Sequence, residues 1–149
     1  MTTRPTTQLM AVANPEPGRE YEVRCDTPEF TCLCPLTGQP DFATVTISYV
    51  PNQWIVELKS LKLYLWHFRD MGAFHEAVTN QILDDFLATV KPRRVTVCTD
   101  WRVRGGIHTV VEASHPDPGA TGAPAADGAS AADGAAIGGG PLTGQSTAQ

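Results

Sequence analysis

The sequence predicts an α+β fold, in which an antiparallel four-stranded sheet carries two helices on one face. Residues 43–50 alternate small or polar residues with Val45, Ile47 and Tyr49, which is the period-two pattern of a half-buried strand. Residues 74–90 instead place large apolar side chains three or four positions apart, as an amphipathic helix does. Two strand-like segments precede the helical region and two follow it. The order strand, strand, helix, helix, strand, strand therefore indicates helices segregated on one side of an antiparallel sheet.

The N-terminal region contains an expected arm and the first two strands. Residues 1–18 are polar and contain prolines, and we expect them to form a flexible arm. Residues 21–33 form the first predicted strand, in which Pro28 marks a bulge or an edge because proline cannot donate a backbone hydrogen bond. The second strand, residues 43–50, ends at Pro51-Asn52, a sequence typical of turns.

Two helices are predicted after this hairpin. Leu61, Leu65 and Phe68 fall at helical spacing, and Ser60 is the expected N-cap of that helix. The second helix covers residues 74–90 and ends before Pro92, because the residue before a proline disfavours helical backbone.

Two further strands are expected at residues 94–101 and 106–112, joined by a short basic connection. A domain of roughly 100 ordered residues has a thin core, and a four-stranded sheet leaves two edges to be paired or covered. We therefore expect this domain to form oligomers through its sheet edges, with active sites between subunits.

The C-terminal segment, residues 116–149, differs in composition from the rest. It consists mostly of alanine and glycine and repeats Ala-Ala-Asp-Gly-Ala. Such a segment has too few large apolar side chains to offset the entropy cost of folding, so we expect it to be disordered. The predicted folded domain is residues 19–115.

Charge and targeting signals restrict the partners. The formal net charge of −5 does not favour general binding to nucleic acid or to an anionic membrane. No secretory signal is visible near the N-terminus, and no run approaches the ~18 apolar residues of a membrane span. We expect a cytoplasmic protein with no direct nucleic-acid binding and no membrane association.

The four cysteines are expected to be reduced thiols, as is usual in the cytosol. Zinc binding is the alternative, but the sequence has no Cys-x-x-Cys or Cys-x-x-His motif. Cys32 and Cys34 are separated by a single residue and would share one face of an extended chain, which suits a tetrahedral site poorly. We expect no metal ion.

Cys34 and Asp41 enclose a Pro-Leu-Thr-Gly-Gln-Pro turn. The prolines and Gly38 allow one compact backbone shape that brings the thiol and the carboxylate together. A thiol and an acid on a stiff loop indicate a nucleophile and a proton donor. The alternatives are that Cys34 is a small buried apolar residue and that Asp41 only accepts hydrogen bonds from turn amides.

Other charged residues have a functional and an ordinary interpretation. Lys59 and Lys62 are three residues apart, so on a helix both ammonium groups share a face that a phosphate can bridge. With Glu57 they are otherwise a solvated polar cluster. His75 and Glu76 open the second helix, where the helix dipole favours a glutamate without any function.

Four segments together resemble one family. They closely resemble the short, single-domain form of the QueF-type 7-cyano-7-deazaguanine reductases, the NADPH-dependent nitrile reductases of queuosine biosynthesis. The resemblance extends from about Tyr21 to Val111 and implies the tunnelling fold, or T-fold. The segments are Cys34-Pro-Leu-Thr-Gly-Gln-Pro-Asp41, Glu57-Leu-Lys-Ser-Leu-Lys-Leu-Tyr64, Phe74-His-Glu76 and Arg104-Gly-Gly106.

The resemblance implies a reaction and its residues. Cys34 is the nucleophile that forms a covalent thioimide with the nitrile, Asp41 is the general acid, and two NADPH are consumed per turnover. The implied substrate contacts are Val56, Glu57, Leu58, His75 and Glu76. The implied anchors for NADPH are Lys59, Lys62 and Arg104.

The resemblance also implies partners. It implies a small-molecule deazaguanine substrate and a homo-oligomer, such as a decamer of two stacked pentamers, with active sites at the interfaces. Two alternatives remain: a zinc-dependent pterin-type cyclohydrolase with the same fold, and a non-catalytic purine-binding module.

Overall fold

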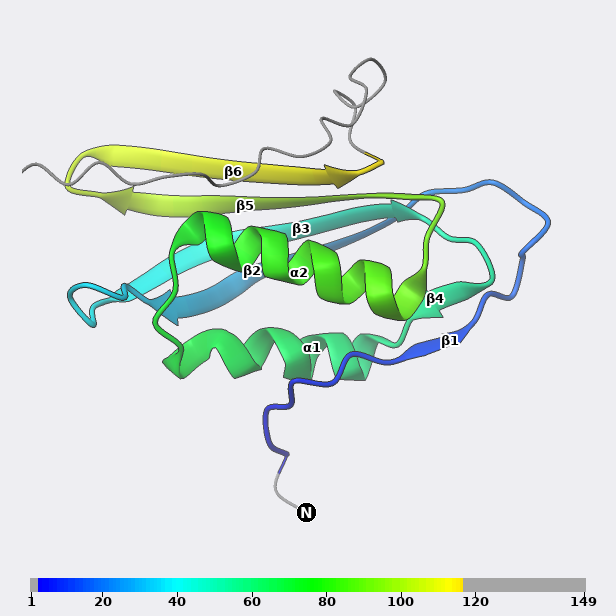
Figure 1. Cartoon of the computed structure of the whole chain (residues 1–149), viewed down its shortest axis with the longest axis horizontal. Helices are drawn as coiled ribbons and strands as arrows, with labels where there is room; N and C mark the ends of the chain where they lie inside the picture. The colour runs from blue at the N-terminus through cyan, green and yellow to red at the C-terminus, as the bar shows by residue number, and fades with distance from the viewer. Residues whose placement is uncertain (1–2, 117–149) are drawn as a thin grey trace, which may run out of the picture.

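The structure is a computed structural model that describes residues 3–116. Its centre is a four-stranded antiparallel sheet with the strand order β2-β3-β5-β6 (Figure 1). The α+β class and the order of the main elements are confirmed. The tail predicted to be disordered lies, apart from Pro116, outside the described residues. The four strands are β2 (Val23–Leu33), β3 (Pro40–Val50), β5 (Arg94–Arg104) and β6 (Ile107–His115).

Several strands are longer than the alternating pattern predicts. β3 begins at Pro40 because its pairing with β2 continues to the turn, where Leu33 faces Pro40. β5 continues to Arg104, which faces Ile107 across the hairpin. The expected irregularity at Pro28 is confirmed, because the register between β2 and β3 shifts between Thr27 and Phe30.

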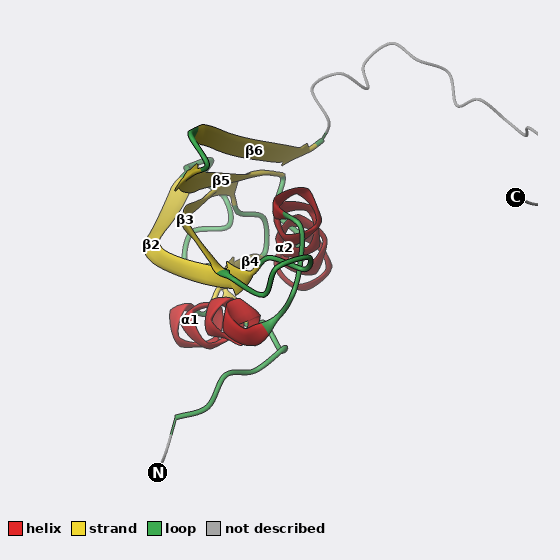
Figure 2. Ribbon diagram, turned by 90° about the vertical axis from the view of Figure 1, so that its left-hand side faces the viewer, coloured by secondary structure: helices red, strands yellow, loops and turns green. Residues whose placement is uncertain are grey.

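Both helices lie on the same side of the sheet (Figure 2). They are α1 (Leu58–His67), followed by the short 3-10 helix η1 (Phe68–Asp70), and α2 (His75–Val90). The expectation that Ser60 caps α1 is wrong. Glu57 is the N-cap, and its carboxylate accepts from the backbone N–H groups of Lys59 and Ser60. Helix α2 ends where Lys91 adopts a left-handed conformation, one residue before Pro92.

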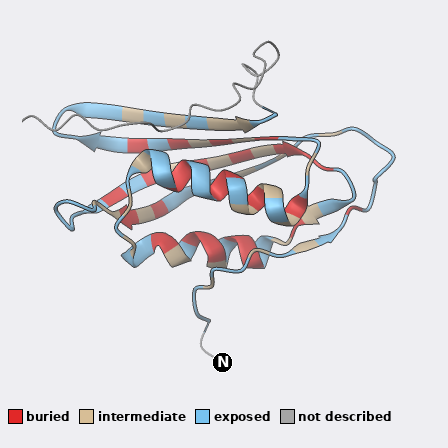
Figure 3. Cartoon of the chain, viewed as in Figure 1, coloured by how far each residue is buried: buried red, intermediate tan, exposed pale blue. Residues whose placement is uncertain are grey.

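The core lies between the sheet and the helices, and the faces of α1 and α2 that point to the sheet are buried (Figure 3). Aromatic side chains occupy its centre: Phe68 packs against Phe30 and Tyr64, and Tyr49 packs edge to face against Phe86. Within the described residues, no buried side-chain polar atom lacks a hydrogen-bond partner. No helix of the part that the structure describes is long and apolar enough to cross a membrane.

The N-terminal arm expected over residues 1–18 is partly ordered, which corrects that expectation. Residues Ala11–Ala13 form β1, which pairs antiparallel with β4 (Trp54–Val56) in a small second sheet. The backbone N–H of Met10 also donates to the Ser60 hydroxyl at 3.0 Å. Backbone pairing of this kind needs no apolar periodicity in the sequence, so the pattern of the arm did not reveal it.

Candidate active site

The loop that carries Cys34 joins β2 to β3. The N–H of Cys34 donates to the carbonyl of Gln39, and the N–H of Gly38 donates to the carbonyl of Cys34, both at 2.8 Å. Gly38 has a φ of +70°, a left-handed conformation that glycine adopts without a steric penalty. The backbone therefore closes on itself around Cys34 and gives the thiol a defined position.

The environment of Cys34 favours its thiolate. Its pKa is lowered to about 7, first by the hydroxyl of Thr37, then by the backbone amides of Leu36 and Thr37, with a smaller effect of Arg104. Cys32, two residues earlier, is fully buried, and burial raises the pKa of its thiol to about 11. Since the thiolate is the nucleophilic form, Cys34 is the reactive member of this pair.

Asp41 lies at the start of β3 and is only 6% exposed. Nη1 of Arg104 donates to its Oδ1 at 2.6 Å, and Nε2 of His75 lies 3.4 Å from its Oδ2. Arg104 reaches in from the end of β5, where the β5–β6 turn follows at Gly105 and Gly106. The carboxylate is thus held between a permanent cation and an imidazole.

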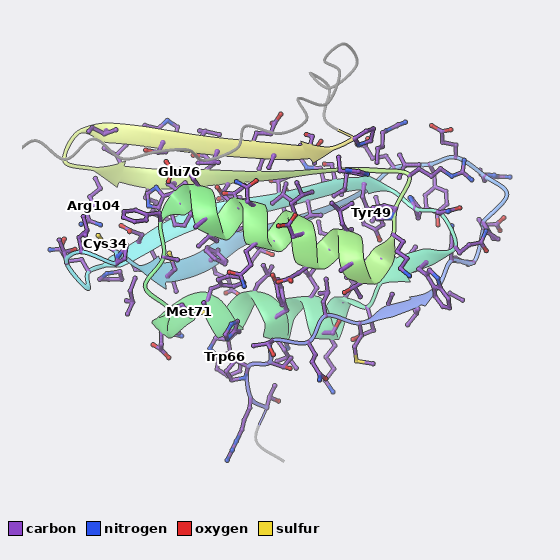
Figure 4. All side chains as sticks on the ribbon, viewed as in Figure 1. Cys34, Tyr49, Trp66, Met71, Glu76 and Arg104 are labelled. Atoms are coloured by element: carbon purple, nitrogen blue, oxygen red, sulfur yellow. The ribbon has the colours of Figure 1, made fainter. Side chains whose placement is uncertain are left out.

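Arg104 also connects this acid to the cysteine loop. Its Nη2 donates to the hydroxyl of Thr37 at 3.0 Å, the same hydroxyl that lowers the pKa of Cys34. The oxygen of Thr37 accepts from Arg104, which leaves its hydrogen available for the sulfur. Cys34, Arg104 and Glu76 lie at one end of the molecule (Figure 4).

A small cavity of about 260 Å³ opens at this end. His75 and Glu76 form the first turn of α2 and contribute to its wall. Cys34 and Asp41, which the sequence predicted to lie near each other, both line this cavity. The cavity is lined mainly by Cys34, Asp41, Phe74, His75, Glu76 and Arg104.

The remaining predicted site residues do not line the Cys34 cavity of the same chain. Val56, Glu57 and Leu58 span the end of β4 and the start of α1, at the end of the molecule opposite the β2–β3 turn (Figure 1). The Glu57 carboxylate is occupied as the helix cap. Lys59 and Lys62 are exposed on α1, and neither forms an ion pair within residues 3–116.

A larger groove of about 710 Å³ lies between β2 and α1. Its walls include Leu58 and Lys62, but it contains neither Cys34 nor Asp41. Although this groove is larger, we place the chemistry in the smaller cavity because the low-pKa thiol and the buried acid are there.

Two features of the site did not emerge from the sequence. Thr37 stands inside the cysteine turn, but its hydroxyl is shared by Cys34 and Arg104 only in the folded chain. Trp101 and Thr99 share the inner face of β5, but the strand pattern did not show that Trp101 stacks on His75 or that Thr99 bonds to Thr79. Among the described residues, no three His, Cys, Asp or Glu side chains cluster so as to hold a metal ion.

Comparison with known proteins gives consistent matches. The family model described as "QueF-like protein" matches residues 40–120. A protein of Thermomicrobium roseum named NADPH-dependent 7-cyano-7-deazaguanine reductase is 61% identical over 115 residues, which cover 77% of this chain and 90% of that protein. A protein of the same name from Nitrosococcus oceani is 59% identical over 119 residues, covering 80% of this chain and 92% of that protein.

A solved structure supports the fold. The apo form of the archaeosine synthase QueF-Like superimposes with a TM-score of 0.59, at 24% sequence identity, over 62% of this chain and 91% of that one. This likeness shows a shared fold.

Proposed function

The chain belongs to the QueF family of NADPH-dependent 7-cyano-7-deazaguanine reductases, and on this premise we propose that it reduces the nitrile of 7-cyano-7-deazaguanine to an aminomethyl group. The reaction belongs to queuosine biosynthesis, and the product is 7-aminomethyl-7-deazaguanine. The observation that carries the proposal is the meeting of a low-pKa thiol and a buried carboxylate, Cys34 and Asp41, in one cavity. We place the enzyme in the cytoplasm, where its thiols stay reduced.

Cys34 supplies the nucleophile. A nitrile carbon accepts hydride poorly, whereas a thioimide is a better acceptor. The Cys34 thiolate attacks the nitrile carbon, a C–S bond forms, and an electron pair of the triple bond moves to nitrogen. For this step Asp41 first takes up a proton from solvent. It passes that proton to the nitrogen, which completes a neutral thioimide and returns Asp41 to the carboxylate paired with Arg104.

Reduction then releases Cys34. NADPH supplies, when bound, the two hydrides that convert the nitrile carbon to a methylene, one before the C–S bond breaks and one after it. When the bond breaks, the electron pair returns to sulfur and restores the Cys34 thiolate, whose pKa of about 7 makes it a good leaving group. Asp41 also passes on the further proton that the substrate nitrogen needs, after taking it up from solvent.

Glu76 is the proposed anchor of the deazaguanine ring. The ring presents adjacent N–H donors, and one carboxylate can accept two parallel hydrogen bonds from them. Glu76 lines the cavity. It directly follows His75, the residue whose Nε2 lies close to Asp41. Glu57 and the backbone of Val56 and Leu58 are proposed as further contacts, with the Glu57 carboxylate also serving as the α1 cap.

The cationic residues fit a cofactor that carries phosphates. Lys59 and Lys62 present ammonium groups three residues apart on the exposed side of α1, which suits the phosphate that distinguishes NADPH from NADH. We propose both as anchors together with Arg104. No Gly-x-Gly-x-x-Gly motif stands at a strand-to-helix turn of the sequence, so lysine and arginine side chains carry this role.

Two copies are needed to complete the site. The Cys34 cavity of about 260 Å³ is smaller than the ~300–1,000 Å³ typical of ligand pockets, and the residues at the start of α1 lie at the other end of the chain. β2 and β6 are both edge strands of the sheet. We propose that a neighbouring copy brings its Glu57–Lys62 segment to the Cys34 cavity, in a ring-based homo-oligomer such as two stacked pentamers.

The decisive experiment measures NADPH oxidation with 7-cyano-7-deazaguanine. We expect the wild type to oxidise two NADPH per nitrile and Cys34→Ala to oxidise none while still binding the nitrile. Cys98→Ala is the matched control, since Cys98 is a free thiol on β5 outside the cavity. A folded wild-type protein that oxidises no NADPH would overturn the proposed function.

A further inference from the structure

His75 stands on an aromatic platform. Its imidazole stacks on the indole of Trp101 with ring centroids 3.7 Å apart and planes 7° from parallel. Trp101 is 1% exposed, and Phe30 packs edge to face against it. The imidazole nitrogens form hydrogen bonds in the plane of the ring, which the stack sets, and Nε2 lies 3.4 Å from Oδ2 of Asp41.

A chain of hydrogen bonds leads from this platform back to His75. Nε1 of Trp101 lies 2.8 Å from Oγ1 of Thr99, which lies 2.7 Å from Oγ1 of Thr79. The Thr79 hydroxyl donates to the backbone carbonyl of His75 at 2.8 Å. Trp101, Thr99 and Thr79 therefore form a relay that ends on His75.

The direction of the relay is fixed by the chemistry of its ends. An indole N–H only donates, and a carbonyl only accepts. The one hydroxyl hydrogen of Thr79 goes to the carbonyl of His75. In the hydrogen bond between the two threonines, Thr99 is therefore the donor and Thr79 the acceptor. Each threonine hydroxyl then accepts one hydrogen bond and donates one, and the ring stack closes the circle from His75 back to Trp101.

Burial makes this circle stiff. Thr79 and Thr99 are both fully buried, so neither hydroxyl can exchange its partner for water without opening the core. Two valines would fill the same space but would leave the buried indole N–H of Trp101 without its acceptor. The circle spans α2 and β5, and it fixes both the carbonyl and the ring of one cavity residue, His75.

We propose that Trp101, Thr99 and Thr79 are positioning residues that hold the imidazole of His75 edge-on to Asp41. This inference rests on the proposed reductase function, in which Asp41 delivers protons to the substrate nitrogen. Asp41 is almost buried, so a fixed neighbour at its second oxygen controls where its carboxyl group points. The other titratable or charged groups that line the same cavity are Cys34, Glu76 and Arg104.

The test compares Thr99→Val, which keeps the shape of the side chain, with Thr99→Ser, which keeps the hydroxyl. We expect Thr99→Val to lower kcat roughly 10- to 100-fold, because small displacements of catalytic groups cost that much, with little change in KM for the nitrile. Thr99→Ser should restore most of kcat. The matched control is Thr96→Val, which removes the hydroxyl pair with Ser114 on the other face of β5.

A second measurement reports the position of the ring directly. In protein labelled with ¹³C at the histidine Cε1, the stack on Trp101 should shift the His75 proton signal upfield through the indole ring current. His75→Gln identifies that signal among the four histidines. Thr99→Val should move it downfield, and Thr99→Ser should return it. This measurement needs no substrate, so it separates a failed inference from a failed reductase function.

Either of two results would overturn the inference. One is a Thr99→Val protein that keeps kcat within twofold of the wild type. The other is a loss of activity with the His75 signal unmoved. If Thr99→Val does not fold, Thr79→Val breaks the same relay at its other threonine, with Thr79→Ser as its conservative partner, and the same two outcomes decide.

Discussion

Arg104 and Asp41 are 63 positions apart in sequence, yet Nη1 of the arginine lies 2.6 Å from Oδ1 of the aspartate. The contact joins the end of β5 to the start of β3, and Arg104 extends it to Thr37 in the cysteine loop. One side chain therefore organises both the proposed acid and the surroundings of the proposed nucleophile.

Replacing Arg104 should affect the chemical step. Arg104→Lys keeps the charge but cannot donate to Asp41 and Thr37 at once in the fixed geometry of a guanidinium. We expect kcat to fall about tenfold, since the lysine leaves Asp41 less well oriented. Steady-state kinetics with NADPH and nitrile varied separately will show this. A rise in KM for NADPH with kcat unchanged would instead make Arg104 solely a cofactor anchor.

Thr37 should control the reactivity of Cys34. Its hydroxyl is the largest cause of the lowered thiol pKa, so Thr37→Val should move that pKa upward from about 7 toward the ordinary 9.0. Less thiolate is then present at pH 7, and alkylation of Cys34 should slow severalfold, by about 3- to 10-fold. The rate of iodoacetamide labelling, mapped to Cys34 by mass spectrometry across pH, measures this. Thr37→Ser should behave like the wild type; an unchanged midpoint in Thr37→Val would contradict the assignment.

Glu57 should stabilise the fold in a pH-dependent way. Hydrogen bonds from the N–H groups of Lys59 and Ser60 lower its pKa below the ordinary 4.5. A carboxyl group with a lowered folded pKa stabilises the protein above its unfolded pKa and loses this contribution as pH falls through the folded value. Glu57→Gln should therefore lower Tm at pH 7 and have progressively less effect as the pH falls below 4.5. Thermal unfolding of both proteins between pH 7 and pH 3 tests this, and a Tm difference that is constant with pH would exclude it.

Tyr64 should contribute to the docking of α1 on α2. Its hydroxyl is buried and donates to Oδ2 of Asp85 at 2.6 Å, and burial followed by this carboxylate raises its pKa. Tyr64→Phe should lower the free energy of unfolding by about 1–3 kcal/mol, the usual contribution of a hydrogen bond to a charged group. Urea denaturation measures the difference. Asp85→Asn keeps an acceptor and should cost less; equal losses would show that the charge, not the hydroxyl, matters.

Active sites shared between copies predict complementation. Cys34→Ala and the double variant Lys59→Ala/Lys62→Ala each damage a different half of the proposed site. Mixed oligomers made by co-expression should recover about a quarter of the wild-type sites, because random assembly pairs intact halves at that frequency. NADPH oxidation by the purified mixture is the measurement. A mixture no more active than its parents would place both halves in the same subunit.

The sequence by itself determined the local features of this protein. Period-two alternation around Val45 and Ile47 gave β3 its buried face, and helical spacing over residues 74–90 gave α2. The cysteine turn and its neighbouring motifs indicated the chemistry through resemblance to a family, which the relatives then confirmed. Such features follow from backbone geometry repeated over a few residues.

Only the tertiary structure decided which distant side chains meet. The contact of Arg104 with Asp41 depends on the register of β3 and β5, and the stack of His75 on Trp101 depends on where α2 lies against the sheet. The sequence pattern likewise did not reveal that β1 pairs with β4 or that the Glu57 side chain caps α1. A sequence pattern specifies the faces of each element, whereas contacts between elements depend on how those faces pack together, and packing is a property of the whole fold.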